Sequence, residues 1–272
     1  MDIRNIKEEP NKVLDDKYLE AMFEIGKVQL IAYIEKGPEN LPEEFPLNVN
    51  IPDNQIVLKD FIDRIGEELM EGYESTDKAF DILYEKGFNI DILTNEETDQ
   101  VKNHLQNACE EQADAIGFFM TLFLYSNIDA EDIYEYARVN GKLRDIDSIS
   151  GVMLFGEKLH DLEVYRRYPI LQQNTPDIPG FYLMDIYSHI QGEKQAIFNV
   201  MYYLNMARNS LKCRPWKRSQ IMTKEIEFQE YLVKAFYMYM GFLCNFQFTP
   251  EGIYREYFKK YKLNMWRLET AY

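Results

Sequence analysis

Two pairs of carboxylate residues, each set in an apolar stretch, carry the strongest chemical signal in the sequence. Glu68 and Glu71 are three residues apart, as are Glu111 and Asp114, and residues at this spacing share one face of a helix. The second pair leads directly into the apolar run 115–125. Buried carboxylates are costly unless they are paired or bind a metal. If the pairs face each other, their oxygens suit Mg²⁺, and we expect two or more ions per site.

The alternative is that these acids lie on an ordinary solvated helix face. The same spacing recurs at Glu74 and Asp77 in this acidic chain, so spacing alone does not define a site. The apolar setting of the second pair favours metal binding. A di-iron centre would need Glu-x-x-His couplets, which none of the three histidines forms (His104, His160 and His189).

A second signal is a set of polar and basic residues near the C-terminus. Lys260, Asn264 and Arg267 follow the spacing of one helical face. A cation, an amide and a guanidinium in one row suit the phosphates and sugar of a nucleotide. A further basic segment, 208–218, contains five basic residues and no acid. The alternatives are a solvated basic patch and a basic last turn that interacts with the helix dipole.

The elements that position these residues are predicted to be helices, so we expect an all-α helical bundle. Apolar residues at helical spacing predict helices at 15–36, 55–74, 76–86, 95–126, 129–136, 181–210, 223–245 and 249–266. A Pro- and Asn-rich loop is expected at 37–54, and a less regular segment at 140–180. Thr94 is expected to begin one helix and Thr249-Pro250 another.

A faint internal repeat relates the two halves of the chain. Five identities recur at a constant offset of 120 positions: Ala115/Ala235, Met120/Met240, Glu131/Glu251, Ile133/Ile253 and Tyr134/Tyr254. Tyr231 and Lys234 stand where the first copy has Glu111 and Asp114. We therefore expect a degenerate duplication in one compact domain, with the metal ligands in 1–140, a connector at 141–180 and the phosphate-binding residues in 181–272.

The composition limits the partners and the location. The chain of 272 residues has a formal charge of −16, which argues against duplex nucleic acid and anionic membranes as partners. The N-terminus lacks a signal-peptide pattern, and the apolar runs are too short to span a bilayer. The three cysteines form no CxxC motif, which fits a reducing compartment. We expect a cytoplasmic protein, in the host cytoplasm if the chain is viral.

Four motifs, in order along the chain, resemble those of the dimeric all-α dUTPases, relatives of the MazG-type nucleoside triphosphate pyrophosphohydrolases. Residues 68–75 resemble the family's Glu-x-x-Glu motif, and residues 111–119 resemble its Glu-x-x-Asp motif with the apolar tail. Residues 214–217 resemble a Trp-Lys element of phage and protozoan relatives.

The fourth motif is the C-terminal signature Lys-Asn-x-x-Asn-x-x-Arg-Gln-x-x-Gly-Tyr. Four positions match it (Lys260, Asn264, Arg267 and Tyr272), whereas three depart from it (Tyr261, Leu268 and Ala271).

The resemblance implies a phage-like homodimer with the fold of the all-α NTP pyrophosphatases. It would hydrolyse a deoxynucleoside triphosphate to the monophosphate and pyrophosphate, with water attacking the α-phosphate. Glu68 and Glu71 would be catalytic, and Glu68, Glu71, Glu111 and Asp114 would hold Mg²⁺. The substrate would be bound by Trp216, Lys217, Lys260, Asn264, Arg267 and Tyr272.

The base is less well specified. In the family, an N-terminal helix carries a Gln and an Asn that recognise uracil, and here Gln29 is the one candidate. dUTP is the expected substrate, and dCTP or a modified pyrimidine nucleotide is the alternative. The gap between the carboxylate motifs is longer than expected, with extra helical sequence near 76–100. A non-catalytic helical interaction protein and a nucleotide-sensing module are the competing functions.

Overall fold

The fold is entirely helical over the part of the chain that the structure describes, which confirms the all-α prediction. The structure is a computed structural model that describes residues 6, 8, 10, 12–141, 146–167, 181–212, 224–245 and 248–270. The elements are α1 (Tyr18–Lys36), α2 (Pro52–Glu85), the 3-10 turn η2 (Ile90–Ile92), α3 (Asn95–Tyr125), α4 (Ala130–Gly141), α5 (Ile149–Arg167), α6 (Phe181–Ser210), α7 (Glu225–Asn245) and α8 (Pro250–Thr270).

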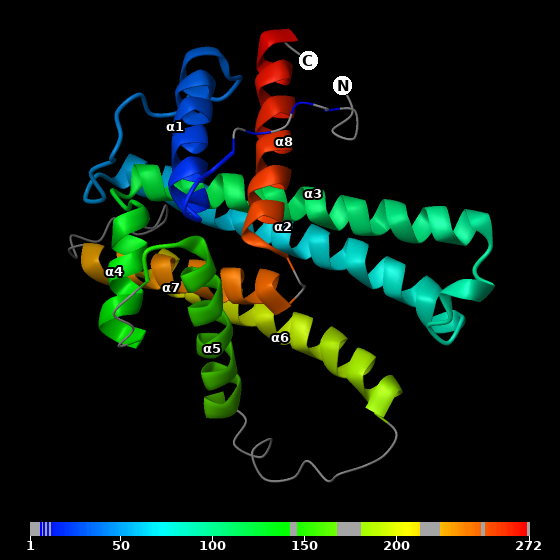
Figure 1. The fold of residues 1–272 in the computed structure, drawn as a ribbon. Coiled ribbons are helices and arrows are strands. Elements are labelled where there is room, and N and C mark those ends of the chain that lie inside the picture. Colours follow the sequence, from blue (N-terminus) through cyan, green and yellow to red (C-terminus); the bar gives the residue numbers. More distant parts are fainter. Residues whose placement is uncertain are drawn as a thin grey trace.

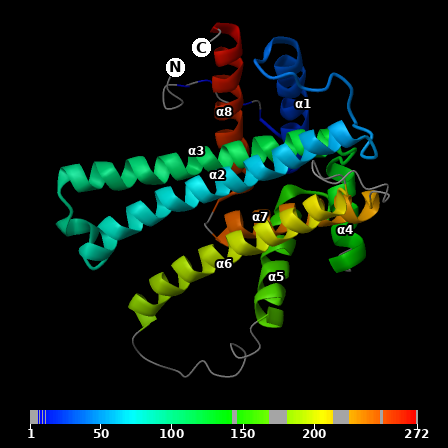
Figure 2. The same cartoon turned by 180° about the vertical axis from the view of Figure 1, so that it is seen from behind.

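Two long helical hairpins and a crossing pair of helices make up the architecture (Figure 1). Helices α2 and α3 pack along each other, α6 and α7 form the second hairpin, and α2 also contacts α6. Helices α1 and α8 stand side by side and cross the first hairpin, where both contact α3. The view from behind shows α5 and α4 on the other side of the second hairpin (Figure 2).

One apolar core joins the elements of both halves of the chain. Phe119 and Phe123 of α3 lie against Phe236 of α7, with ring centroids 5.3 and 5.1 Å away. Tyr239 stacks on Phe119 at 5.4 Å, and its hydroxyl donates to the Gln112 carbonyl at 2.8 Å. Large aromatic side chains therefore join α3 and α7, and a buried phenol is tolerated because its hydroxyl has an acceptor.

The predicted helix starts are confirmed at both threonines. The Thr94 hydroxyl accepts from the Glu97 amide, and the Glu97 carboxylate accepts from the Thr94 amide, so the two form a capping box. The Thr249 hydroxyl accepts from the Gly252 amide at 3.1 Å, and Pro250 is the first residue of α8. These contacts satisfy amides that lack partners within the helix.

Two sequence predictions were wrong in their boundaries. The predicted helices 55–74 and 76–86 form the single helix α2. The segment 140–180, expected to be less regular, contains α5. Its buried residues Ile149, Val152 and Met153 follow helical spacing, whereas the glycines in the same stretch weaken the helical signal.

The helix ends keep the offset of the sequence repeat. Helix α3 ends at Tyr125 and α7 at Asn245, and α4 begins at Ala130 and α8 at Pro250. Both offsets are 120 positions, since 245 − 125 and 250 − 130 give the same value. The duplication, and the division into two halves and a connector, stay predictions.

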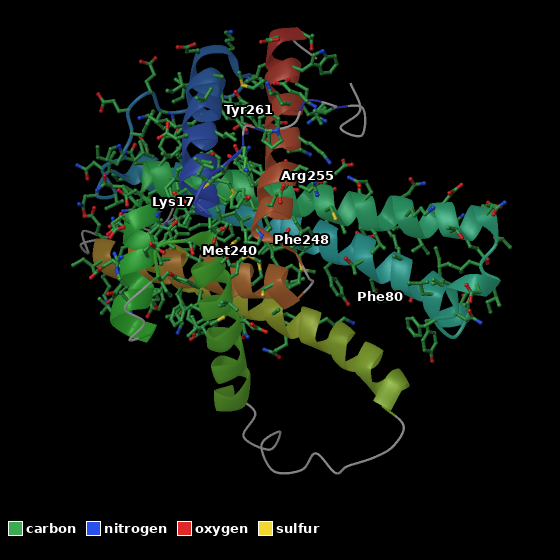
Figure 3. The ribbon with its side chains drawn as sticks, viewed as in Figure 1. Lys17, Phe80, Met240, Phe248, Arg255 and Tyr261 are labelled. Atoms are coloured by element: carbon green, nitrogen blue, oxygen red, sulfur yellow. The ribbon has the colours of Figure 1, made fainter. Side chains whose placement is uncertain are left out.

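The extra residues between the carboxylate motifs lengthen the first hairpin. They form the distal parts of α2 and α3 with η2 between them, and Figure 3 labels Phe80 on this extension. Lys86 and Glu97 close its end through an ion pair of 2.8 Å. None of the described helices combines the length and apolarity that a membrane span requires.

The crossing of α5 and α7 depends on two glycines in contact. A Cβ atom added to Gly241 would overlap the backbone at Gly156, and one added to Gly156 would overlap the backbone at Tyr237 and Gly241. Figure 3 labels Met240, the residue before this contact on α7. The two backbones can approach this closely because neither residue has a side chain.

Gly241→Ala should therefore destabilise the protein by about 2 kcal/mol or more, because α5 and α7 must move apart in a packed core. Urea unfolding followed by circular dichroism measures the effect. The matched control is Gly117→Ala on α3, where the nearest atom to the new Cβ would be 3.6 Å away. It should be neutral or stabilising by about 0.5 kcal/mol. Equal effects of the two substitutions would contradict this view of the crossing.

Candidate functional site

Two of the four predicted acidic residues meet three of the predicted substrate-binding residues in one pocket between α1, α2, α3 and α8. The pocket has a cavity volume of about 220 Å³. Its lining includes carboxylates, cations, amides and aromatic rings: Glu39, Glu68, Asp114, Arg64, Lys260, Arg267, Gln29, Asn264, Tyr33, Phe61, Phe118 and Tyr257. Helices α2 and α3 each supply one predicted metal ligand to the lining, Glu68 and Asp114, whereas Glu71 and Glu111 are not among the lining residues. Helix α8 supplies Lys260, Asn264 and Arg267.

Three of the four predicted metal ligands form a cluster at the α2–α3 contact. Carboxylate oxygens of Glu68, Glu71 and Glu111 lie within 4.8 Å of one another. Glu68 and Glu111 are partly buried, whereas Glu71 is exposed. Oxygen atoms at these separations could hold a hard cation such as Mg²⁺ or Ca²⁺.

A close approach of the two helices places these acids side by side. Gly72 follows Glu71, and a Cβ atom at position 72 would lie 2.5 Å from the side-chain nitrogen of Gln112. Gln112 in turn follows Glu111 on α3 and is 7 % exposed. The missing side chain at Gly72 thus makes room for the Gln112 amide.

The fourth predicted ligand, Asp114, lies in the same pocket but outside that cluster. Its Oδ2 is 2.5 Å from the Lys260 Nζ, and the two side chains are 19 % and 11 % exposed. The expected set of four facing carboxylates is thus brought together only in part, because one of them has a lysine as its partner.

Burial and neighbouring acids disfavour the ionised forms of Glu68 and Glu111 when no cation is bound. Burial, followed by the charge of Asp114 and a hydrogen bond with Glu111, raises the pKa of Glu68 from 4.5 to about 8. Burial also raises the pKa of Glu111. For Asp114, burial raises the pKa and the Lys260 ammonium opposes that shift. Desolvation and like charge both penalise the ionised forms.

The predicted basic row is present on α8. Lys260, Asn264 and Arg267 all line the pocket, and Lys260 and Asn264 are both buried. Phe248, labelled in Figure 3, lies just before this helix. Gln29, the candidate for base recognition, lines the pocket from α1, and its side-chain oxygen is buried without a hydrogen-bond partner.

Three predicted substrate ligands, Trp216, Lys217 and Tyr272, lie outside the described residues. In the second half, Lys234 corresponds to Asp114 in the sequence repeat. Its ammonium lies 4.2 Å from the centroid of the Tyr203 ring, and it is not among the residues that line the pocket.

Arg64 is a pocket residue that the sequence reasoning missed. Its guanidinium donates to both oxygens of Glu39, at 3.0 and 2.8 Å, and to Asp60 at 2.8 Å. It also lies over the rings of Phe61 and Phe118, at 5.5 and 5.7 Å. The sequence signal that could have identified Arg64 is its position one helical turn before Glu68, which places both on one helix face. No pattern in the sequence linked Arg64 to Glu39.

No known protein family, curated protein or solved structure matches this chain. The resemblance to the all-α dUTPases therefore rests on the motifs quoted from the sequence. The geometry of the pocket is an independent observation on the same residues.

The raised pKa of Glu68 gives the metal-free protein a testable pH dependence. Between 4.5 and about 8, the folded chain binds a proton at Glu68 that the unfolded chain has released. The free energy of unfolding should therefore fall as pH rises through this window. Urea unfolding in a chelating buffer measures the slope, and Glu68→Gln should reduce it. Glu67→Gln, at an exposed neighbour, is the control; equal slopes in wild type and Glu68→Gln would refute the assignment.

Proposed function

We propose that the protein is a Mg²⁺-dependent pyrophosphohydrolase of deoxynucleoside triphosphates, similar to the dimeric all-α dUTPases. The observation that carries the proposal is the single pocket in which Glu68 and Asp114 face Lys260, Asn264 and Arg267. The predicted metal ligands and the predicted phosphate ligands are far apart in the sequence, and residues of both sets line this one pocket. Carboxylates for a cation beside cations for an anion suit a metal-bound polyphosphate.

The residues present fit a magnesium site. The donors are carboxylate oxygens, three of which already lie within 4.8 Å of one another. Asp114, which is paired with Lys260, lines the same pocket as Glu68. Mg²⁺ bound to Glu68, Glu71, Glu111 and Asp114 would neutralise phosphate oxygens and lower the pKa of a bound water. Two or more ions per site remain our expectation, with substrate phosphates and waters as the other ligands.

The remaining pocket residues would bind and orient the substrate. Lys260 and Arg267 neutralise the β- and γ-phosphates, and Asn264 contacts phosphate or sugar. Glu68 orients the attacking water or accepts its proton, because a carboxylate oxygen accepts a hydrogen bond from water. The products are the monophosphate and pyrophosphate.

The base is bound on the α1 side in this proposal, where Gln29 provides an amide. An amide offers both a donor and an acceptor, so it can pair with the edge of a pyrimidine. dUTP is the first substrate to test, followed by dCTP and modified pyrimidines. We further propose that the protein acts as a homodimer in the cytoplasm.

Pyrophosphate release across the deoxynucleotides and ribonucleotides tests the proposal. We expect Mg²⁺-dependent release from one pyrimidine deoxynucleotide, reduced about 100-fold or more in Glu71→Gln and in Asp114→Asn, because each removes a metal ligand. Glu74→Gln is the matched control, since Glu74 shares the spacing but is exposed and pairs with Lys78. Circular dichroism checks that the variants remain helical.

Two other results would refute the proposed pyrophosphohydrolase activity. Unchanged turnover in both Glu71→Gln and Asp114→Asn would remove these acids from the mechanism. Tight binding of an intact triphosphate without pyrophosphate release would favour a nucleotide-sensing module.

A further inference from the structure

The partner of Asp114 distinguishes it from the other three carboxylates. Glu68, Glu71 and Glu111 face one another, whereas Asp114 contacts the Lys260 ammonium at 2.5 Å. Both side chains are largely withdrawn from solvent, at 19 % and 11 % exposure. A charge-assisted hydrogen bond in such a setting is stronger than one at the surface.

Lys260 differs from the lysines beside it on α8. Lys259 pairs with Glu256 and Lys262 with Glu8, and neither lysine is among the residues that line the pocket. Lys260 does line it and forms an ion pair with Asp114, a predicted metal ligand. Its ammonium has three N–H donors but a single positive charge, so a phosphate that binds it competes with Asp114 for that charge.

We propose that Lys260 is the resident counter-cation of Asp114, which a divalent cation must displace, and that its transfer to phosphate couples metal binding to triphosphate binding. This inference rests on the proposed function, because it assigns Asp114 to the metal and Lys260 to the substrate. It adds the statement that the two sites share one movable positive charge.

The direction of the coupling follows from electrostatics. A lysine at 2.5 Å from Asp114 opposes a divalent cation through like-charge repulsion and through the hydrogen bond that must break. A phosphate that draws Lys260 away removes both obstacles. By linkage, the metal then raises the affinity for triphosphate by the same factor as triphosphate raises the affinity for the metal.

The test is the binding of Mn²⁺ alone, in place of Mg²⁺, measured without nucleotide by calorimetry and by the loss of the free-ion electron spin resonance signal. The wild-type chain is compared with Lys260→Met and Lys260→Gln at one fixed pH and ionic strength. Both variants should bind Mn²⁺ about tenfold tighter or more, because a charged hydrogen bond no longer competes. Lys260→Gln is the milder variant and covers the case in which Lys260→Met does not fold.

Lys259→Met is the matched control, since it removes the same charge one residue away, outside the pocket. It should bind Mn²⁺ with the affinity of the wild type. Lys260→Arg keeps a cation beside Asp114, so its Mn²⁺ binding should remain as weak as that of the wild type. If the wild type binds Mn²⁺ and the folded Lys260 variants bind it no more tightly, the proposed exchange of Lys260 for a divalent cation is wrong, whereas the metal site itself stands. If neither the wild type nor any Lys260 variant bound Mn²⁺, the metal site of the proposed function would fail, and the exchange with it.

Discussion

The arrangement of this protein depends on one constraint: α3 places a carboxylate, Asp114, at the edge of the apolar core. Asp114 lies one residue before Ala115, which is fully buried, and one helical turn before Phe118, which packs against the core. An ionised carboxylate there requires a partner, because desolvation raises its free energy. Helix α8 provides that partner through Lys260. The crossing of α8 over α3 thus offsets a charge as well as covering an apolar surface.

The same crossing creates the pocket. Helix α1 packs against α8, and both contact α3, so three helices enclose the space above the α2–α3 contact. The small residue Gly26 allows this approach, since a Cβ atom there would lie 2.9 Å from the Met120 Cβ and 3.2 Å from the Tyr257 hydroxyl. The long hairpin extension lies away from this region (Figure 1), so the extra residues between the motifs do not interrupt the acidic cluster.

The sequence predicted what depends on local patterns and missed what depends on packing. The spacing of Glu68 and Glu71 placed both on one face of a helix, because residues three apart share a face. That Glu111 lies opposite them follows from the packing of α2 against α3. The cap at Thr94 followed from side-chain chemistry. The pairing of Asp114 with Lys260 required two helices distant in the sequence to cross at one point, and no local pattern specifies that crossing. Arg64 was missed for the same reason, because its partner Glu39 belongs to a loop whose path is set by tertiary contacts.

Most charges in the pocket are balanced within the chain itself. Arg64 is held by Glu39 and Asp60, and Lys260 by Asp114. A ligand that supplies only a cation, or only an anion, would break one of these contacts and leave a buried charge without a partner, which is unfavourable. A metal-bound polyphosphate supplies both, so each released group finds a new partner. Internal charge balance of this kind favours binding of the metal–polyphosphate complex over binding of either component alone. The free energy needed to break the internal ion pairs is recovered only when the metal and the polyphosphate both bind.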